Sequence, residues 1–364
     1  MNWNGTKIKS KAKEQSMAIS RLAEAIGVSR QTVSDWTKGQ IPKGNHLVSL
    51  CQILKTSPNY FFEDIVDKSI FVPAHRARRK AKITLDVQNK AFEMAKEYSL
   101  FFRSSSEPDI VPVARVTERT NDNIIKIAKY LRNLSGLEDT DPINYTDAFK
   151  LVEGLGINVI FKNFPETIKS YAFYTRIHNH RVVFVNNSTN VIDLIFQLLH
   201  ESVHAIRDEI EVADEYDKEE EDFCDQVANN VQFTDEYVRF VYTTIKDSPV
   251  GHQINNLKAF GQKYGHSLYG ISSRIKELDT DFTLNVGGAD TNLKKKFHTI
   301  GEVLFAKEDP CEYINILYTL SPNFVNKILL QLESISYRRL ADLLDLDSVL
   351  DAKLVKQELA KLIK

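Results

Sequence analysis

The sequence predicts a multidomain protein that is mainly α-helical and contains one small β-sheet. Its 364 residues exceed what one hydrophobic core usually supports. From about Val116, apolar patterns of helical spacing alternate with short runs rich in Val, Ile, Phe and Tyr, which indicates an α+β body. We expect four parts in chain order: an all-α head at residues 1–70, a basic joint with a connecting helix at 71–115, the α+β body at 116–240, and a helical C-terminal region at 241–364.

Charge is distributed unevenly along the chain, although the formal net charge is only −2. Residues 1–90 contain 16 Lys and Arg against 7 Asp and Glu, a net charge of +9, which leaves 31 against 42, or −11, for the rest. A basic head on an acidic body is the electrostatic pattern of a nucleic-acid-binding domain joined to a domain of another function.

The bulk composition is that of a soluble globular protein, with 43% apolar and 26% charged residues. Cys51, Cys224 and Cys311 lack paired spacing, which argues against a disulfide framework and fits a reducing compartment. The N-terminus lacks the apolar core of a signal peptide, and no apolar run approaches the length of a membrane span. We therefore expect a cytoplasmic protein without a membrane partner.

The head carries the pattern of a helix-turn-helix. Ala23 and Gly27 are four residues apart and small enough to let two helices cross closely, and Gly27 also supplies the turn. Ser29 can cap a second helix, in which Val33 and Trp36 point inward.

This pattern resembles the Cro/phage-repressor (XRE) family over residues 15–62, including the closing Ser57-Pro-Asn-Tyr-Phe-Phe62. The resemblance implies an all-α fold that binds DNA through these residues, with a recognition helix at 29–38. Because such domains commonly occupy paired half-sites, a homodimer is expected. The alternative is a protein-docking module, since Asp35 and Glu24 dilute the positive charge.

Five residues in and after the recognition helix are candidate DNA contacts: Arg30, Gln31, Thr32, Lys38 and Lys43. Arg30 and Gln31 have the side chains best suited to reading guanine and adenine edges. Lys38 and Lys43 are suited to contacting phosphates.

The basic joint follows the head. Its cluster of basic residues at 75–82 is either a further phosphate contact or a solvated surface. An amphipathic helix is predicted from about Thr84 to Phe102, and the polar segment at 103–109 reads as a linker.

The body begins with helices and short strands. Helices are predicted at 124–131 and 147–155, and strands at 157–161, 171–177 and 181–185. The last two strands form a hairpin around Asn179, in which His178 and His180 are expected to be turn residues and not metal ligands. Tyr171 and Tyr174 either donate to a developing oxyanion or pack in the sheet.

The pentapeptide His200-Glu-Ser-Val-His204 is the most informative motif of the chain. On a helix, positions i and i+4 share one face, so His200 and His204 can hold one metal ion while Glu201 takes a proton from a bound water. This is the ligand-and-base arrangement of a zinc-dependent peptidase. Asn190 can cap the helix, and the apolar run that follows predicts a buried, rigid segment. The alternative is a chance match of two surface histidines around a glutamate.

A catalytic zinc usually takes three protein ligands and keeps a fourth position for water. The chain resembles the ImmA/IrrE family of metallopeptidases at Phe196–His204 and again at Glu221–Ala228. The resemblance implies a zincin-like fold in which Zn²⁺ is held by His200, His204 and Glu221.

Three positions depart from the family pattern, namely Cys224, Asp225 and Thr234, where alanine, asparagine and proline are common. They leave open whether Glu219 or Glu220 replaces Glu221 as the third ligand. Cys224 is expected to be a small buried residue at the alanine position, and the alternative is a thiolate that ligates zinc or blocks the site.

Residues 241–364 carry no catalytic motif. Gln253–Leu278 has a helical pattern, and the leucines between 340 and 362 predict a helical end. We expect a helical bundle that docks a partner, and the alternative is another helix-turn-helix at 335–344.

The combined expectation is a regulatory zinc endopeptidase with a DNA-binding head. By family resemblance its substrate would be a helix-turn-helix repressor, whose cleavage releases stress or mobile-element genes. One strand of the sheet could pair with the extended backbone of this substrate. The alternatives are an XRE-type regulator whose peptidase-like domain senses or docks a partner without turnover, and an antitoxin-like protein.

Overall fold

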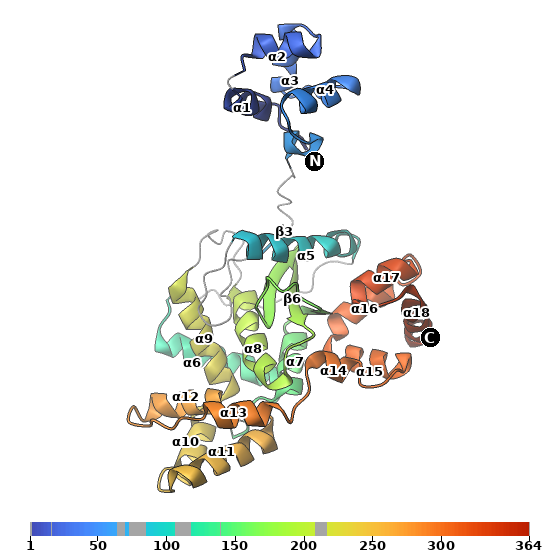
Figure 1. Cartoon of the computed structure of the whole chain (residues 1–364). Coiled ribbons are helices and arrows are strands. Elements are labelled where there is room, and N and C mark those ends of the chain that lie inside the picture. The colour runs from blue at the N-terminus through green and yellow to red at the C-terminus, as the bar shows by residue number, and fades with distance from the viewer. Residues whose placement is uncertain are drawn as a thin grey trace. The chain divides into compact units, whose positions relative to one another are not determined.

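The computed structural model describes residues 2–15, 17–63, 70–72, 85–105, 118–138, 140–207 and 217–363. The chain forms two compact units, Met1–Lys68 and Ser69–Lys364, which are shown in Figure 1. The basic cluster at 75–82 and the part of the predicted linker at 106–109 lie outside the described residues.

The first unit contains the predicted helix-turn-helix. Its elements are β1 (Asn2–Trp3), α1 (Thr6–Glu14), α2 (Ile19–Ile26), α3 (Arg30–Thr37), α4 (Asn45–Ile53), the 3₁₀ turn η1 (Pro58–Phe61) and β2 (Phe62–Glu63). Gly27 adopts a φ of 78°, a left-handed conformation that favours glycine, and it ends α2. Ser29 caps α3 by accepting a hydrogen bond from the Thr32 amide, so the turn chemistry read from the sequence is confirmed.

The core of the first unit is built where α1, α2 and α3 meet. Leu22, Val33 and Trp36 are buried, as the sequence pattern requires for two crossing helices. Gly5 permits the close approach, because a Cβ atom there would lie 1.9 Å from the Trp36 carbonyl oxygen.

A four-stranded sheet organises the second unit. Its strands are β3 (Ile70–Phe71), β4 (Asn158–Lys162), β5 (Ala172–Ile177) and β6 (His180–Asn186), in the order β3-β5-β6-β4. β4 runs parallel to β6, and the other neighbours are antiparallel. The predicted hairpin is confirmed: His178 and Asn179 turn the chain with φ values of 47° and 67°. His180 is the first residue of β6 and packs against the ring of Phe102.

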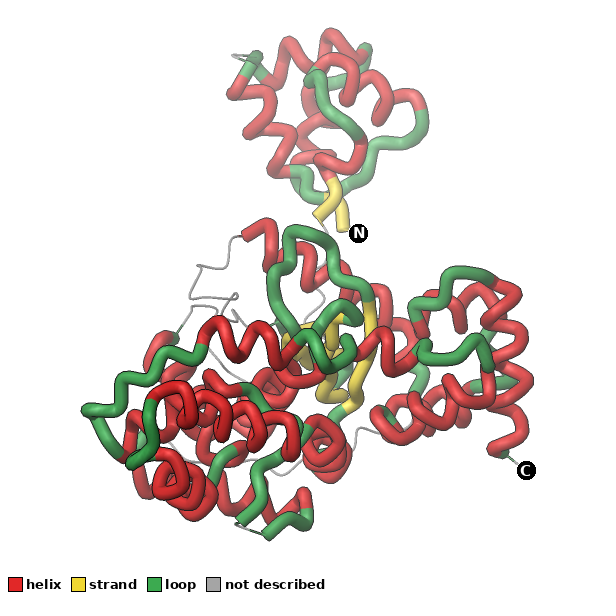
Figure 2. Tube along the Cα trace, turned by 60° about the horizontal axis from the view of Figure 1, so that its bottom comes forward, coloured by secondary structure: helices red, strands yellow, loops and turns green. Residues whose placement is uncertain are grey.

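Helices cover both faces of this sheet (Figure 2). On one face, Tyr98 of α5 (Leu85–Arg103) contacts Phe184 of β6, with ring centroids 5.3 Å apart. On the other, Phe149 of α7 (Tyr145–Gly154) contacts Phe161 of β4. α8 (Val191–Arg207) lies on this second face, because Arg181 of β6 donates a hydrogen bond to the Ala205 carbonyl of α8. α6 (Asn121–Ser135) and α9 (Lys218–Gln232) complete the layer.

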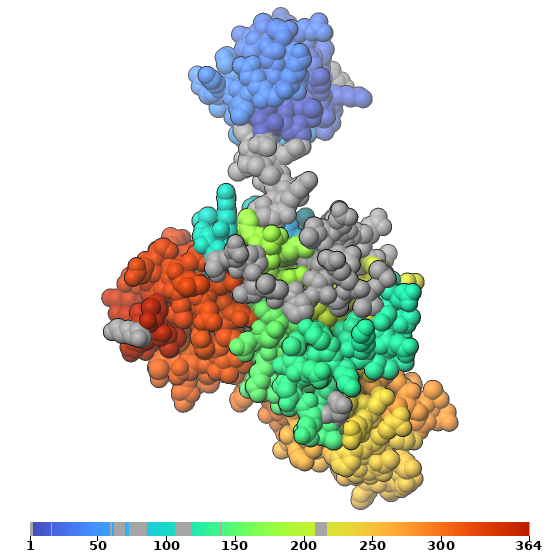
Figure 3. All heavy atoms as spheres, turned by 180° about the vertical axis from the view of Figure 1, so that it is seen from behind, coloured from blue at the N-terminus to red at the C-terminus, as the bar shows by residue number. Residues whose placement is uncertain are grey.

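The C-terminal helices belong to two hydrophobic clusters. They are α10 (Asp235–Ile245), α11 (Val250–Tyr264), α12 (Leu268–Leu278), α13 (Gly287–Lys294), α14 (Ile300–Leu304), α15 (Pro310–Leu320), α16 (Pro322–Gln331), α17 (Tyr337–Leu344) and α18 (Val349–Leu362). Helices α10–α13 share a core of their own, whereas α14–α18 share the core of the sheet. Figure 3 shows the two groups on different sides of the body. The predicted helical stretch Gln253–Leu278 is broken, because Gly265 ends α11 with a φ of 69°.

His266 makes the α10–α13 core sensitive to pH. The side chain is fully buried, Tyr237 Oη lies 2.7 Å from its Nε2, and burial lowers the pKa of His266 to about 4. The unfolded chain, with a histidine pKa near 6.5, then binds more protons between pH 6.5 and pH 4, so stability falls as the pH drops through this window.

We expect the loss across this window to be on the order of 3 kcal/mol for this group. Chemical denaturation of the wild type and of His266→Gln at about pH 7 and about pH 4 measures it, with a smaller pH dependence expected for the variant. Equal pH dependence in the two proteins would show that His266 does not carry the effect.

Candidate functional site

Helix α8 holds the His-Glu-Ser-Val-His motif in a fixed position. Asn190 precedes the helix, and its side-chain oxygen accepts a hydrogen bond from the Ile192 amide, as predicted for a cap. The Asn190 amide group also donates to the carbonyls of Lys294 and Phe297. Most residues of α8 are buried, which leaves the helix little freedom to move.

The structure brings His200, His204 and Glu221 together. The Nε2 atoms of the two histidines are 3.0 Å apart, and each lies near one carboxylate oxygen of Glu221, at 3.5 Å for His200 and 3.2 Å for His204. Donor atoms that bind one zinc tetrahedrally at about 2.1 Å lie about 3.4 Å from one another. The three side chains therefore have the spacing of a shared metal site.

Helix α9 determines which glutamate reaches the histidines. Asp217 caps the helix, and Glu219 and Glu220 both form ion pairs with Arg119. Glu220 also pairs with Arg207 at the end of α8. Among the described residues, Glu221 is the glutamate of this run that lies beside the imidazoles, where it is buried.

Asp225 supports the cluster and was not identified as a site residue from the sequence. Its Oδ1 lies 3.0 Å from Nδ1 of His200, so it can hold the ring with Nε2 turned toward Glu221. The available signal was its position one helical turn after Glu221, on the same face of α9.

The carboxylates of Glu221 and Asp225 favour positive charge at the His200 imidazole. Burial by itself would lower the pKa of His200, but the nearby carboxylates of Asp225 and Glu221 outweigh it and raise this pKa to about 10. Burial would raise the pKa of Glu221, but its contacts with His200 and His204 hold that pKa well below the usual range. The contacts of Glu221 Oε2 with His200 Nε2 and of His200 Nδ1 with Asp225 are ion-pair contacts and not hydrogen bonds, so Glu221 Oε2 and His200 Nδ1 both lack a hydrogen-bond partner among the described residues. Two imidazole nitrogens and a carboxylate oxygen are a donor set that fits zinc.

Glu201 lies next to the cluster, and its carboxylate is fixed by two hydrogen bonds. Oε2 accepts from the backbone amide of Tyr174 in β5 at 2.8 Å, and Oε1 accepts from Gln197 at 2.6 Å. The side chain is only 1% exposed. Tyr174 is fully buried in the sheet, and the Tyr171 hydroxyl donates to Asp193.

Two of the positions that depart from the family pattern have structural roles. Cys224 is buried, with Sγ 3.7 Å from Nδ1 of His204, and burial raises the pKa of the thiol well above its usual value. The protonated form is therefore favoured, as expected of a small buried residue. Thr234 caps α10 by accepting a hydrogen bond from the Tyr237 amide.

The predicted DNA contacts lie on or just after α3. Arg30, Gln31, Lys38 and Lys43 are exposed, and Thr32 is half-buried with its hydroxyl 2.8 Å from that of Ser29. Gln31 donates to Asp35 one turn later, so it would have to exchange this bond for one to a base. Their roles in DNA binding stay predictions.

Comparison with known proteins gives two family matches. A helix-turn-helix family model matches residues 8–61, and a model described as an IrrE N-terminal-like domain matches residues 152–234. An uncharacterized HTH-type transcriptional regulator, y4wC, of Sinorhizobium fredii is 38% identical over 65 residues, which is 18% of this chain and 46% of that protein. No solved structure matches the chain. None of the described helices is both long enough and apolar enough to cross a membrane.

Proposed function

We propose that this chain, which joins an XRE-type helix-turn-helix domain to an ImmA/IrrE-type peptidase domain, is a DNA-binding regulator that acts as a zinc-dependent endopeptidase in the cytoplasm. The convergence of His200, His204 and Glu221 beside Glu201 is the observation that carries this proposal. A zinc peptidase site requires three metal ligands and a base close together, and here two helices bring them to one point. A chance match of surface side chains would not place all four groups together.

Each residue of the site has a role in hydrolysis. Zinc held by His200, His204 and Glu221 would supply a Lewis acid for the scissile carbonyl and lower the pKa of the attacking water. Glu201 takes the proton of this water and delivers it to the leaving amine. The bonds from Tyr174 and Gln197 keep the carboxylate in place, and Asp225 orients His200.

The substrate we propose is a protein, and specifically a helix-turn-helix repressor whose cleavage derepresses stress or mobile-element genes. An unpaired edge of β5 supports a peptide substrate. β3 pairs with β5 only at Arg176 and Ile177, and among the described residues no strand pairs with the rest of that edge. An extended peptide could add to this edge next to Glu201.

The test is incubation of the zinc-loaded protein with helix-turn-helix repressors from its own organism, those encoded near its gene first, followed by mass spectrometry of the products. The expected result is one discrete cut that a chelator abolishes and added zinc restores. Absence of cleavage with fully zinc-loaded protein would count against the peptidase function.

DNA binding by the head yields a separate prediction. Arg30→Ala should weaken specific binding by about 1–3 kcal/mol if Arg30 reads a base edge. Lys43→Ala should make the slope of the logarithm of the binding constant against the logarithm of the salt concentration shallower by about one. Electrophoretic or anisotropy titrations at several salt concentrations measure both effects.

Lys13→Ala is the matched control for this experiment, because Lys13 is an exposed lysine of the same unit outside α3. Equal effects of all three substitutions would show that the head attracts DNA only through its overall charge.

A second candidate function is suggested by the burial of the site. His200, Glu201 and Glu221 are each less than 5% exposed, which suits a domain that senses or docks a partner without turnover. In that case the protein is an XRE-type regulator or an antitoxin. Stoichiometric zinc without cleavage, together with stable co-purification with a neighbouring gene's product, would favour this function.

A further inference from the structure

Ion pairs join the end of α8 to the start of α9 beside the metal ligands. Arg207, the last residue of α8, follows His204 by three positions. Glu220 directly precedes Glu221 in the first turn of α9. Nε and Nη2 of Arg207 donate to the two carboxylate oxygens of Glu220, the second at 2.8 Å. A bidentate arginine–carboxylate pair fixes the orientation of its partners as well as their distance.

The Arg207–Glu220 pair is largely shielded from water. The Arg207 side chain is 11% exposed, and that of Glu220 is 21% exposed. The guanidinium also lies over the ring of the buried Phe223, with Cζ 4.6 Å from the ring centroid. A shielded pair of this kind restricts its partners more than an exposed ion pair does, and it is costly to break.

Arg119, which precedes α6, holds the other carboxylates of the same turn. It donates to Glu220 at 3.0 Å and to Glu219 at 3.1 Å. It also donates to Asp217, the residue that caps α9. Successive residues of a helix point about 100° apart, so only one of three neighbours can face the imidazoles. With Glu219 and Glu220 held by arginines, that residue is Glu221.

The first turn of α9 needs such support. Helix ends fray, because the first turn lacks part of the backbone hydrogen bonds that hold the interior of a helix. Val227, Ala228 and Val231 are buried and fix the later part of α9, but Glu221 lies before them. A ligand that must first be ordered lowers the affinity for a metal, so the site gains from a third ligand that is already fixed.

We propose that Arg207, assisted by Arg119, is a positioning residue of the metal site. It acts through Glu220: their pair holds the first turn of α9 in the rotation that directs Glu221, and not Glu220, toward the two imidazoles. The inference rests on the proposed function, because it takes the histidine cluster to be a zinc site.

The sign of the effect separates positioning from simple charge. Arg207 carries a positive charge about one helical turn from His204, so its removal would strengthen the binding of a cation if charge alone mattered. A loss of positioning weakens the binding instead. We expect Arg207→Ala to bind zinc about tenfold more weakly than the wild type, which is at the low end for groups that support metal ligands.

Arg207→Lys keeps the charge but not the bidentate contact, so it should bind zinc nearly as weakly as Arg207→Ala. Competition between the full chain and a chromogenic chelator measures these affinities. The visible absorption of the cobalt-substituted protein gives a second measurement, because it depends on the number and geometry of the ligands. The spectrum of Arg207→Ala should differ from that of the wild type.

A double-mutant cycle tests whether Arg207 acts through Glu220. Glu220→Ala should weaken zinc binding by a similar factor, and the combination with Arg207→Ala should bind no more weakly than either single variant. Additive losses would contradict this route. If Arg207→Ala fails to fold, Arg119→Ala provides the test at a more exposed position, and it should also weaken zinc binding.

Lys162→Ala is the matched control. Lys162 of β4 pairs with Glu97 of α5 at 2.6 Å and lies over the ring of Tyr98, so it joins two elements as Arg207 does, but these partners lie outside α8 and α9. The free energy of unfolding of the metal-free variants shows what each broken ion pair costs by itself. The zinc affinity of Lys162→Ala should equal that of the wild type.

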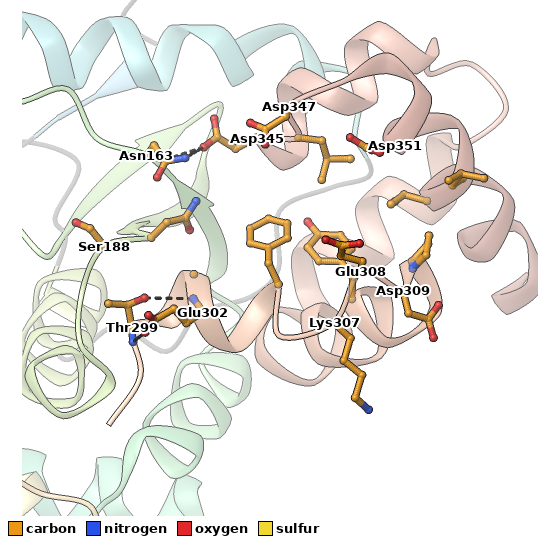
Figure 4. A pocket seen from close by; sticks show the side chains of 18 residues that line it. Asn163, Ser188, Thr299, Glu302, Lys307, Glu308, Asp309, Asp345, Asp347 and Asp351 are labelled. Atoms are coloured by element: carbon orange, nitrogen blue, oxygen red, sulfur yellow. Dashed lines mark hydrogen bonds between the residues drawn. The ribbon is translucent and has the colours of Figure 1, made fainter. Parts of the chain in front are cut away.

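A second control tests for zinc bound by other carboxylates. A cavity of about 670 Å³ in the same unit is lined by six carboxylates, none of which is a proposed ligand (Figure 4). Glu308→Gln combined with Asp347→Asn removes two exposed members of this set and should leave the zinc affinity unchanged.

Two results would overturn the inference and leave the proposed function standing, given a wild type that binds zinc. One is an Arg207→Ala protein that binds zinc as tightly as the wild type or more tightly. The other is an equal loss of zinc affinity in Lys162→Ala. A wild-type protein that binds no zinc would overturn the proposed function and this inference together.

Discussion

Glu201→Gln is expected to abolish peptide cleavage while zinc stays bound. Glutamine has nearly the shape of glutamate, but it cannot take a proton from the attacking water, and the loss of a general base typically costs about 10²–10⁴-fold in rate. The ligands His200, His204 and Glu221 are unchanged, so the metal content should remain at one equivalent. Cleavage rates and zinc content, measured on the same preparation, give the comparison.

Glu236→Gln is a matched control, because Glu236 is an exposed glutamate of α10. It should cleave at the wild-type rate. If zinc-loaded Glu201→Gln protein also cleaves at that rate, Glu201 is not the base. A glutamine at 201 still faces two donors, the Tyr174 amide and the Gln197 side chain, so folding of the variant is to be checked by circular dichroism.

The three carboxylates of α9 are expected to contribute unequally to the affinity for zinc. Glu221→Ala removes a ligand and should cost more than Asp225→Ala, which removes support from His200 and should weaken zinc binding by about 10–100-fold. Glu219→Ala should have no effect, because this side chain is largely exposed and pairs with Arg119. Competition with a chromogenic chelator measures all three affinities.

This series also tests which residues of α9 face the histidines of α8, since the three substituted residues lie within two turns of α9. Loss of zinc in Glu219→Ala with retention in Glu221→Ala would contradict the assignment. Equal, small effects of all three substitutions would place the metal elsewhere.

Much of the fold could be predicted because its signals are local. The helix-turn-helix follows from Gly27 and the Ser29 cap, and α8 follows from Asn190 and the apolar run behind it. Each depends on contacts within a few residues, which sequence patterns express directly. The β5–β6 hairpin around Asn179 could be predicted for the same reason.

The remaining features depend on contacts between distant segments. The amide of Tyr174 meets Glu201 only because β5 packs on α8, and no spacing in the sequence encodes that pairing. The choice of Glu221 over Glu219 and Glu220 depends on how α9 lies against α8. The break at Gly265 had a local signal, a glycine within a helical pattern, and the prediction of one continuous helical stretch overlooked it.

Anomalous X-ray diffraction at the zinc absorption edge, on crystals of the zinc-loaded protein, tests the metal centre most directly. The predicted result is a single peak in this domain, about 2.0–2.2 Å from Nε2 of His200, Nε2 of His204 and a carboxylate oxygen of Glu221, with a fourth position open. A peak bound instead by Cys224 and Nδ1 of His204, or no peak at these residues at full zinc occupancy, would contradict it.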